Sequence, residues 1–300
     1  STPLYSSAAS DVYKRQVMKK LILLLLITLI YSQTPTEVYL FELSKVNGQY
    51  SLTNPINISN NPGYDNQPSF MKNGRQVLFA STRNQQTDIV SYNIRTKNKK
   101  WLTNTEGGEY SPLQIRSSNT FSAIRLDPDG YQRLYSYSMY SGKSTELVKD
   151  LKIGYHGWVG RDELVSFVLG EPFTLQHSNI KTGVNTILDD TIGRTILKLP
   201  KSKHVAYISK KQTPWTVNTV DLESGEIETM IHTLDESEDF VITHSGVLIM
   251  GKGSVLYNFD PYNHSDWVRI ADLSNYGLKG ITRLAISPKA DKIVIVVEEE

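Results

Sequence analysis

Residues 36–53 read TEVYLFELSKVNGQYSLT, and this stretch decides the fold. Apolar and polar residues alternate on both sides of Asn47 and Gly48, which is the pattern of two antiparallel strands joined by a tight turn. This hairpin stands alone, because no hairpin of a complementary kind precedes it. Its complement is predicted at the other end of the chain, where residues 292–297 read KIVIVV and no further hairpin follows. A chain whose two ends complete one sheet closes a ring, and we expect that ring here.

Between these ends a pair of hairpins recurs about every forty residues. One hairpin of each pair has an alternating strand that ends in a polar residue, followed by a turn and a second strand. These polar residues are spaced by 45, 41, 42 and 39 positions and are Asn93, Ser138, Asn179, Asp221 and Asp260. Glycines in three of the following turns supply the backbone freedom that a tight hairpin needs, namely Gly142, Gly183 and Gly225.

The other hairpin of each pair ends in a strongly apolar strand, as expected for a strand that is covered on both faces. These strands are Val77–Ala80, Phe121–Ile124, Leu164–Val168, His204–Ile208, Gly246–Met250 and Lys292–Val297. Five complete units and two complementary halves make six. The sequence therefore predicts an all-β fold, a six-bladed β-propeller over residues 33–300 with four antiparallel strands per blade and the last blade closed by the N-terminal strands. A sandwich of two sheets is the alternative that this pattern leaves open.

Composition narrows the classes of protein to which the chain can belong. Hydrophobic residues make up 39% and charged residues 21%, a balance typical of a globular protein rather than a disordered chain or a polytopic membrane protein. The formal net charge of +1 gives no surplus of Lys and Arg for neutralising phosphates, so nucleic acid is not an expected partner. The absence of cysteine excludes disulfides, thiolate metal sites, cysteine nucleophiles and lipid attachment at a cysteine.

The first 32 residues are interpreted as two segments that do not belong to the mature protein. Residues 6–16 read SSAASDVYKRQ, the in-frame translation of a common transposase-based sequencing adapter, so residues 1–17 are interpreted as an assembly artefact. Residues 18–32 begin with MKK, continue as a short apolar stretch and end on Ser32, which is the pattern of a secretory signal peptide. A short membrane anchor is the alternative, although the apolar stretch spans about 16 Å against a hydrocarbon core of ~30 Å. We therefore expect a periplasmic or secreted protein whose mature chain does not span a membrane.

Residues 64–94 read YDNQPSFMKNGRQVLFASTRNQQTDIVSYNI and resemble the repeat of TolB-like propellers, a WD-repeat-like family. In that repeat a polar residue precedes a proline and an aromatic strand, and then come an S-P-D-G-like turn, an apolar strand and an S-D-R motif. Residues 71–74 (MKNG) stand at the turn here and residues 81–84 (STRN) at the later motif, while residues 285–297 carry a second copy. The resemblance implies a bladed fold and a lipoprotein or other envelope partner. Members of the family also carry a separate N-terminal α/β domain, for which residues 33–36 leave no room, so we expect the propeller alone to make such contacts.

Chemical motifs that would identify an enzyme are missing from the sequence. It contains no G-x-S-x-G nucleophile elbow, H-E-x-x-H zinc motif, P-loop or dinucleotide fingerprint. The six histidines fall in separate repeats without the i, i+4 spacing of a helical metal site. The DPDG sequence at residues 127–130 lacks the further ligands of an EF-hand and is interpreted as a turn. We therefore predict neither catalytic residues nor a bound metal or cofactor.

The candidate binding site comes from the geometry of the predicted ring. The loop before each innermost strand of a propeller reaches the mouth of the central channel, where six loops converge. Alignment of the repeats places at this mouth Asp65, Asn66, Glu109, Tyr110, Tyr155, His156, Arg194, Glu238, Asp239 and Lys279. Trp158 is expected near the same mouth, and the mixture of charges and rings suits a peptide or a glycan better than a simple polyanion. The alternative is that these residues only join neighbouring blades by hydrogen bonds.

Three functions are compatible with the sequence, and the first is the one that we predict. It is an exported, non-catalytic propeller that recognises an envelope protein or a cell-wall fragment at the channel mouth. The second is a calcium-dependent hydrolase or lactonase, whose oxygen ligands would be Asp65, Asn66, Glu109 and Asp239. Arg194 and Lys279 oppose this second function because they would repel a cation. The third is a structural role in a secretion or gliding apparatus.

Overall fold

The computed structural model describes residues 34–115 and 119–299. The predicted adapter translation, residues 1–17, and the predicted signal peptide, residues 18–32, lie outside the described residues. Residues 35–300 form one compact unit. In the part of the chain that the structure describes, the regular structure is β-strand apart from one turn of 3-10 helix, η1 (Leu273–Tyr276). Within the same part, no helix has the length and the apolar composition that crossing a membrane requires.

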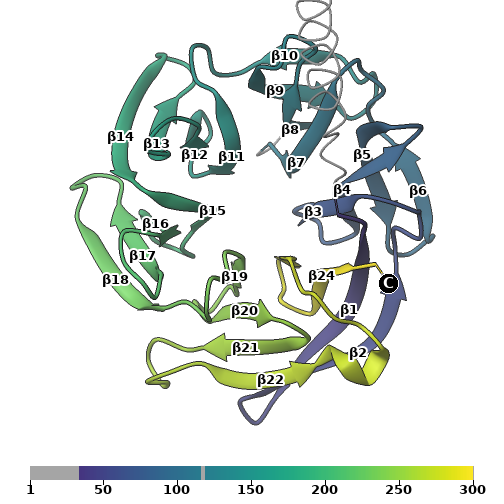
Figure 1. Cartoon of the computed structure of the whole chain (residues 1–300), viewed down its shortest axis with the longest axis vertical. Helices are drawn as coiled ribbons and strands as arrows, with labels where there is room; N and C mark the ends of the chain where they lie inside the picture. Colours follow the sequence, from purple (N-terminus) through teal and green to yellow (C-terminus); the bar gives the residue numbers. More distant parts are fainter. Residues whose placement is uncertain (1–33, 116–118, 300) are drawn as a thin grey trace, which may run out of the picture. The chain divides into compact units, whose positions relative to one another are not determined.

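The described strands form six sheets of four, which stand around a central axis as the blades of a ring (Figure 1). The innermost strands are β3 (Asp65–Phe70), β7 (Gly108–Gln114), β11 (Ile153–Trp158), β15 (Ile192–Lys198), β19 (Phe240–Ile242) and β23 (Arg283–Ile286). The second strands are β4 (Gln76–Arg83), β8 (Thr120–Leu126), β12 (Glu163–Val168), β16 (His204–Ser209), β20 (Leu248–Lys252) and β24 (Lys292–Glu298). The third strands are β5 (Gln86–Asn93), β9 (Gln132–Ser138), β13 (Thr174–Asn179), β17 (Thr216–Asp221), β21 (Val255–Phe259) and β1 (Thr36–Val46). The outer strands are β6 (Asn98–Trp101), β10 (Ser144–Glu146), β14 (Val184–Asp190), β18 (Ile227–His232), β22 (Val268–Asp272) and β2 (Gln49–Asn57).

The innermost strands meet around the axis and enclose a channel. Each of them contacts the innermost strands of the two neighbouring blades, from β3 through β7, β11, β15 and β19 to β23, which returns to β3. The predicted six-bladed β-propeller with four antiparallel strands per blade is confirmed. Side chains from all six blades can therefore reach one channel.

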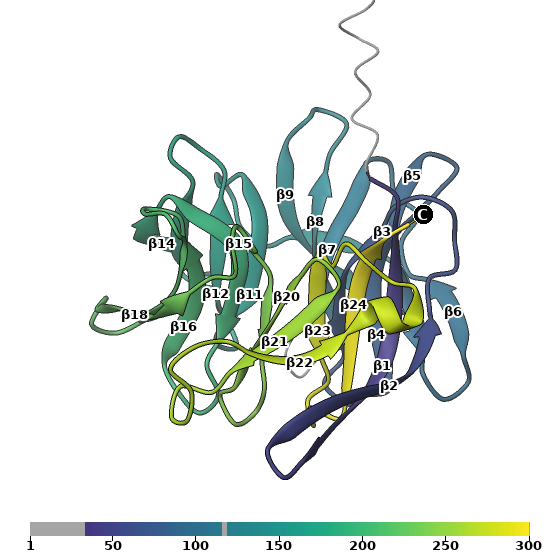
Figure 2. The same cartoon turned by 60° about the horizontal axis from the view of Figure 1, so that its bottom comes forward.

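The two ends of the ring meet in one blade, which contains β2, β1, β24 and β23 in that order. Strand β1 pairs antiparallel with β24, so that Val38 lies opposite Val296 and Leu40 opposite Val294. Figure 2 shows these two strands running side by side. The predicted closure of the last blade by the N-terminal strands is confirmed, and the two-sheet sandwich is excluded. Strand β1 is paired on both edges, so closure leaves it no open edge.

The polar residues that recur along the sequence hold the turn after the third strand of a blade. Asp221 Oδ1 accepts hydrogen bonds from the backbone N–H groups of Glu223 and Ser224, at 2.7 and 2.8 Å. The side-chain oxygens of Asn93 and Asn179 accept from their own turns in the same way. A short polar side chain thus replaces a backbone acceptor in the turn, which explains why the sequence repeats a polar residue there.

The hydrophobic core is divided into layers between neighbouring blades. In the β7 blade, Phe121 and Tyr137 stack with ring centroids 5.2 Å apart and are fully buried against Leu78 and Ile89 of the β3 blade. Because each blade is covered on both faces, its second strand is almost continuously apolar instead of alternating. Burial of one side chain of this size contributes about 1.5–3 kcal/mol. These layers hold the innermost strands in fixed positions around the channel.

Candidate functional site

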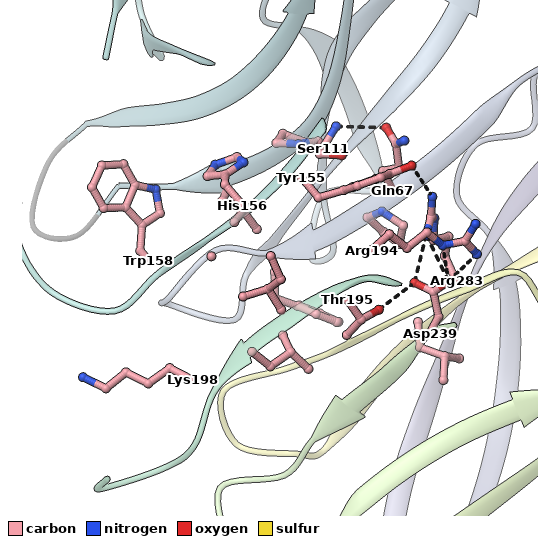
Figure 3. A pocket seen from close by; sticks show the side chains of 18 of the residues that line it. Gln67, Ser111, Tyr155, His156, Trp158, Arg194, Thr195, Lys198, Asp239 and Arg283 are labelled. Carbon is pink, nitrogen blue, oxygen red and sulfur yellow. Dashed lines mark hydrogen bonds and ion pairs between the residues drawn. The ribbon is translucent and has the colours of Figure 1, made fainter. Parts of the chain in front are cut away.

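A cavity of about 370 Å³ lies in the channel. It is lined by β3, β7, β11, β15 and β23, together with Asp239, the residue before β19. Figure 3 shows its polar and aromatic wall, which includes Gln67, Ser111, Tyr155, His156, Trp158, Arg194, Thr195, Lys198, Asp239 and Arg283. All six blades therefore contribute to one site.

Bulges in two innermost strands bring polar side chains to this cavity. Strands β3 and β7 each contain a shift of register against the second strand of their blade. In these irregular stretches Gln67 and Ser111 have φ angles of 54° and 52°, a left-handed conformation that costs about 1–2 kcal/mol for a residue other than glycine. The Ser111 N–H donates to Gln67 Oε1 at 2.9 Å and so links the two bulges. A bulge changes the face to which the following side chains point, and here both residues line the cavity.

One end of the cavity carries an ion-pair cluster of Arg194, Asp239 and Arg283 (Figure 3). Arg194 Nε donates to Asp239 Oδ2 at 2.8 Å, and Arg283 Nη1 lies 3.1 and 3.0 Å from Oδ1 and Oδ2. Arg283 Nη2 also donates to the Tyr155 hydroxyl at 3.1 Å, and Thr195 Oγ1 donates to Asp239 Oδ1 at 3.3 Å. Two guanidinium groups hold one carboxylate, so the cluster carries a net positive charge.

A second carboxylate lies behind Arg194. Arg194 Nη1 is 3.3 Å from Glu238 Oε2, and Lys210 forms an ion pair with the same carboxylate. The Lys210 ammonium in turn lies over the Trp215 ring, 4.1 Å from the ring centroid. These contacts fix the Arg194 guanidinium from the side away from Asp239.

The protonation states of the cluster follow from burial and from pairing. The Asp239 side chain is 16% exposed, and burial raises the pKa of Asp239 to about 6, although Arg194 opposes this rise. Asp239 is thus a carboxylate at pH 7 and loses its charge in mildly acidic solution. Burial alone would lower the pKa of Arg194, but the charges of Asp239 and Glu238 raise it overall. Arg194 therefore remains charged at physiological pH.

The middle of the cavity wall carries polar groups without a charge, beside apolar side chains such as Leu113 and Ile196. His156 is 6% exposed, and burial lowers its pKa to about 3, so the imidazole is uncharged near neutral pH. Ser122 Oγ lies 2.7 Å from His156 Nε2 and accepts a hydrogen bond from Trp158 Nε1 at 2.9 Å. His156 Nδ1 and the Ser111 hydroxyl oxygen are buried and have no hydrogen-bond partner among the described residues.

The lining of the cavity is positively charged as a whole. Among the described lining residues, one carboxylate, Asp239, faces four cations, which are Lys72, Arg194, Lys198 and Arg283. Lys198 lies at the end of β15, away from the arginine cluster (Figure 3), and its Nζ donates to the Val159 carbonyl at 2.6 Å. A surplus of positive charge in a confined site favours an anionic ligand over a cation.

The residues that the sequence predicts at the channel mouth do not all lie together. Those that line the cavity are Tyr155, His156, Arg194 and Asp239, and Trp158 lines it with them. Glu238 is not part of the cavity lining, but it forms an ion pair with Arg194, which is. Those outside the cavity lining are Asp65, Asn66, Glu109, Tyr110 and Lys279.

Three of the outlying residues join neighbouring blades. The Asp65 carbonyl accepts from Thr36 Oγ1 at 2.9 Å, and Asn66 Nδ2 donates to the same hydroxyl at 3.2 Å, which ties the β3 blade to the closing blade. Glu109 is fully buried beside Asp88 of the β3 blade. These three residues thus make contacts between blades, which is the alternative that the sequence left open.

The last blade contributes a different residue from the one expected. Lys279 is exposed in the loop before β23, whereas Arg283 within β23 lines the cavity. Tyr110 packs edge-on against Tyr64, with ring centroids 6.3 Å apart. The sequence placed its candidates in the loops before the innermost strands, but most of them lie within those strands, and the cavity is lined mainly by the strands. Alignment on the strands would have found Arg283, which lies near the start of an innermost strand as Arg194 does.

The candidate calcium ligands are not brought together. Asp65 and Glu109 are buried at two different blade junctions, and both oxygens of Asp239 are held by guanidinium groups. In the described part of the chain, no three His, Cys, Asp or Glu side chains are placed so that they could hold a metal ion. The donor set that a calcium-dependent hydrolase would need does not fit this cavity.

No protein-family model matches the sequence, and no curated protein matches it. Solved structures do match. A putative TolB from Agrobacterium tumefaciens gives a TM-score of 0.68 at 12% identity, covering 89% of this chain and 99% of that one. TolB from Acinetobacter baumannii gives a TM-score of 0.55 at 12% identity, covering 89% of this chain but 64% of that one, so this chain spans less than two thirds of its length.

A gluconolactonase from Xanthomonas campestris is also similar, with a TM-score of 0.62 at 8% identity, covering 89% of this chain and 97% of that one. At such low identities, the likeness concerns the fold and not the function. The chain has a TolB-like six-bladed propeller fold.

Proposed function

We propose that this TolB-like propeller is an exported, non-catalytic binding module that holds an anionic group of an envelope protein or a cell-wall fragment in its central channel. The observation that carries the proposal is the cluster of Arg194, Asp239 and Arg283 at one end of a cavity with a positively charged lining. Arginine is suited to this task because its planar fork of donors matches the two oxygens of a carboxylate.

Arg283 is the side chain best placed to hold such a group. Its bonds to Asp239 and Tyr155 use Nη1 and Nη2. A guanidinium carries five N–H donors, so the Nε–H and further Nη hydrogens remain for a ligand. The Tyr155 ring, whose centroid lies 5.2 Å from the guanidinium carbon, supports Arg283 from one side. A ligand carboxylate would thus share the arginines with Asp239.

The titratable groups of the cavity suit binding better than acid–base catalysis. His156 takes up a proton only near pH 3, so it is a poor general base or acid near neutral pH. Asp239 is ionised at pH 7, but both of its oxygens are engaged by arginines. The hydrolase alternative has no matching set of metal ligands in its favour, and the similarity to a gluconolactonase is one of fold.

We place the protein in the periplasm or outside the cell. The support is the pattern of residues 18–32, and the absence of cysteine is compatible with an oxidising compartment. Fractionation of cells that express the natural gene tests this placement: the protein is expected in the periplasmic or extracellular fraction, without residues 18–32. Recovery in the cytoplasm with those residues intact would contradict it.

Affinity capture from an envelope extract tests the proposed function. The immobilised protein and its variant Arg283→Gln are compared with Lys181→Gln, which removes an exposed lysine from the turn between β13 and β14. We expect one protein or glycan to be retained by the wild type and by Lys181→Gln. Its retention by Arg283→Gln falls about tenfold or more, because a hydrogen bond to a charged group contributes about 1.5–3 kcal/mol.

Two results of this comparison count against the proposal. Equal capture by all three proteins would show that the ligand does not use the arginine cluster. Turnover of an ester or a lactone by protein that holds stoichiometric calcium would replace the binding module with the hydrolase.

A further inference from the structure

The middle of the cavity wall holds two polar atoms that the protein itself does not satisfy. His156 Nδ1 and Ser111 Oγ are buried and have no hydrogen-bond partner among the described residues. Buried polar groups are nearly always paired in proteins, and one that is left unpaired costs about 1–3 kcal/mol. Both residues line the cavity, so a ligand that shifts the groups covering these two atoms can supply the missing partner.

These two groups have fixed positions before any ligand arrives. Ser122 Oγ lies 2.7 Å from His156 Nε2 and accepts from Trp158 Nε1 at 2.9 Å, so one hydroxyl orients both rings. The backbone of Ser111 is held by its N–H bond to Gln67. Rigid polar groups select a ligand by the positions of its own polar atoms and lose little freedom when it binds.

Two aromatic rings flank the unpaired atoms. Trp158 lies on one side of His156 and Tyr155 on the other (Figure 3). Both rings are partly exposed, and Tyr155 packs edge-on against Phe167 with ring centroids 5.7 Å apart. A partly exposed aromatic face offers an apolar platform for the C–H face of a sugar ring, while the hydroxyls of the sugar reach polar neighbours.

Cationic side chains stand at both ends of this neutral stretch. Arg194 and Arg283 lie at one end and Lys198 at the other (Figure 3). A second hollow of about 680 Å³ continues from the Lys198 end, and it shares with the first Lys72, Gln114, Trp158 and Lys198. It adds Lys201 and Lys203, of which Lys203 pairs with Glu223. The channel therefore presents a cationic, a neutral and again a cationic section.

We propose that the channel binds an acidic oligosaccharide, whose sugar rings carry carboxylates; this inference rests on the binding function proposed above. One carboxylate lies on Arg194 and Arg283. Ring hydroxyls of the same or the adjoining sugar pair with Ser111 Oγ and His156 Nδ1. The apolar face of a sugar packs on Trp158, and the next carboxylate along the chain reaches Lys198.

An acidic peptide fits this arrangement less well. A sugar hydroxyl is both donor and acceptor, so it pairs with the Ser111 hydroxyl and with either tautomer of the neutral His156. Peptide N–H and C=O groups each have one fixed role and would match only one of these states.

Isothermal titration with defined probes tests this inference. The probes are trigalacturonate, trimannuronate, the carboxyl-reduced form of each trimer, and the peptide Glu-Glu-Glu. We expect a uronate trimer to bind the wild-type protein. Its carboxyl-reduced form, which lacks the charged contacts, and the peptide, which lacks the hydroxyl contacts, are expected to bind at least about tenfold more weakly. Added salt lowers the affinity for the uronate trimer.

Matched variants locate the binding in the channel. Arg283→Gln and Trp158→Leu are each expected to lower the affinity for the uronate trimer about tenfold. Lys181→Gln is expected to leave this affinity unchanged. Thermal melts establish that each variant is folded. Arg283→Lys, which keeps a charge beside Asp239, replaces Arg283→Gln if the latter does not fold, and it is expected to bind more weakly than the wild type.

The possible failures of this inference and of the proposed function are distinguishable. Absence of binding by both uronate trimers, or equal binding of a carboxyl-reduced form, overturns the inference. Tighter binding of Glu-Glu-Glu that depends on Arg283 also overturns it but leaves the binding module in place. Cleavage of a trimer, seen as new reducing ends, overturns the non-catalytic function and keeps the ligand class.

Discussion

Glu109 is an acid buried at the junction of the β3 and β7 blades, with no exposed surface. Tyr137 donates to its Oε1 at 3.3 Å and Thr103 to its Oε2 at 3.2 Å. Burial raises the pKa of Glu109 to about 8, and the nearby charge of Asp88 is the second cause. Glu109 is therefore mostly protonated at pH 7, which lets two acids lie side by side between blades.

The variant Glu109→Gln is expected to remove part of the pH dependence of stability. Folded Glu109 holds its proton more tightly than the unfolded chain does, so its contribution is complete below a pH of about 4.5 and is lost as the pH rises through about 8. Between pH 5 and 9 the wild type should lose on the order of a few kcal/mol of unfolding free energy that the variant keeps. Urea denaturation at both pH values measures this difference. Parallel pH profiles of the two proteins would mean that Glu109 is already ionised in the fold.

Asp239 competes with a ligand for the same two guanidinium groups. As the pH falls through about 6, Asp239 gains a proton and loses its hold on Arg194 and Arg283, while Glu238 still faces Arg194. His156 does not titrate in this range, because its pKa is about 3. We expect the affinity for an acidic trisaccharide to rise roughly tenfold from pH 7 to pH 5, as one charged contact is gained. In Asp239→Asn the affinity is high at both pH values, and a titration that shows the wild-type rise unchanged in this variant would assign it to another group.

The strands are the elements that the sequence predicts best, and the reason is physical. A second strand covered on both faces must be apolar along its length, and a turn held by a side-chain oxygen must carry a residue such as Asp221 or Asn179. The apolar second strand recurs in all six blades and the polar turn residue in five of them, which leaves a visible period. The bulges at Gln67 and Ser111 occupy equivalent positions in neighbouring blades and decide which side chains enter the cavity, but the alternation of apolar and polar residues does not reveal them. Of the charged and aromatic residues that line the cavity, the sequence therefore predicts Tyr155, Arg194 and Asp239 but not Arg283.

The turn glycines give a test at the level of one element. Gly225 has a φ of 74°, and a Cβ added there would meet nothing within 4 Å. Gly225→Ala should therefore destabilise the protein by about 1 kcal/mol through backbone conformation alone. Gly225→Asn should cost less, because Asn tolerates the left-handed region. Equal unfolding midpoints for both variants and the wild type in urea would contradict this account of the repeat.

At the scale of the whole molecule, the ring is what creates the site. Asp239 and Arg283 belong to consecutive blades, and Tyr155 reaches Arg283 from the β11 blade, far away in sequence. Tyr155 and Arg283 come from blades that are not neighbours and meet across the channel because the blades form a ring, which β1 and β24 close. The sequence shows this closure through its two complementary ends, but it cannot show which side chains then face one another across the channel, since that depends on packing between all six blades.

An engineered disulfide between β1 and β24 can test the closure of the ring. Glu42 and Lys292 lie opposite each other on β1 and β24, close to the surface. Opposed residues on antiparallel strands have Cβ atoms about 4.5–5.5 Å apart, near the range that a disulfide spans. Since the protein has no cysteine, the double variant Glu42→Cys, Lys292→Cys contains one possible intramolecular disulfide.

The measurement is the fraction of this double variant that mild oxidation cross-links within one chain, read by mass spectrometry and by mobility on a non-reducing gel. The control is Glu42→Cys, Lys181→Cys, which places the second cysteine on an exposed turn of the β11 blade. We expect nearly complete cross-linking of the first pair in the folded protein and none of the second. A first pair that stays reduced in folded protein, or that cross-links no better than the control, would contradict the closed ring and with it the cavity.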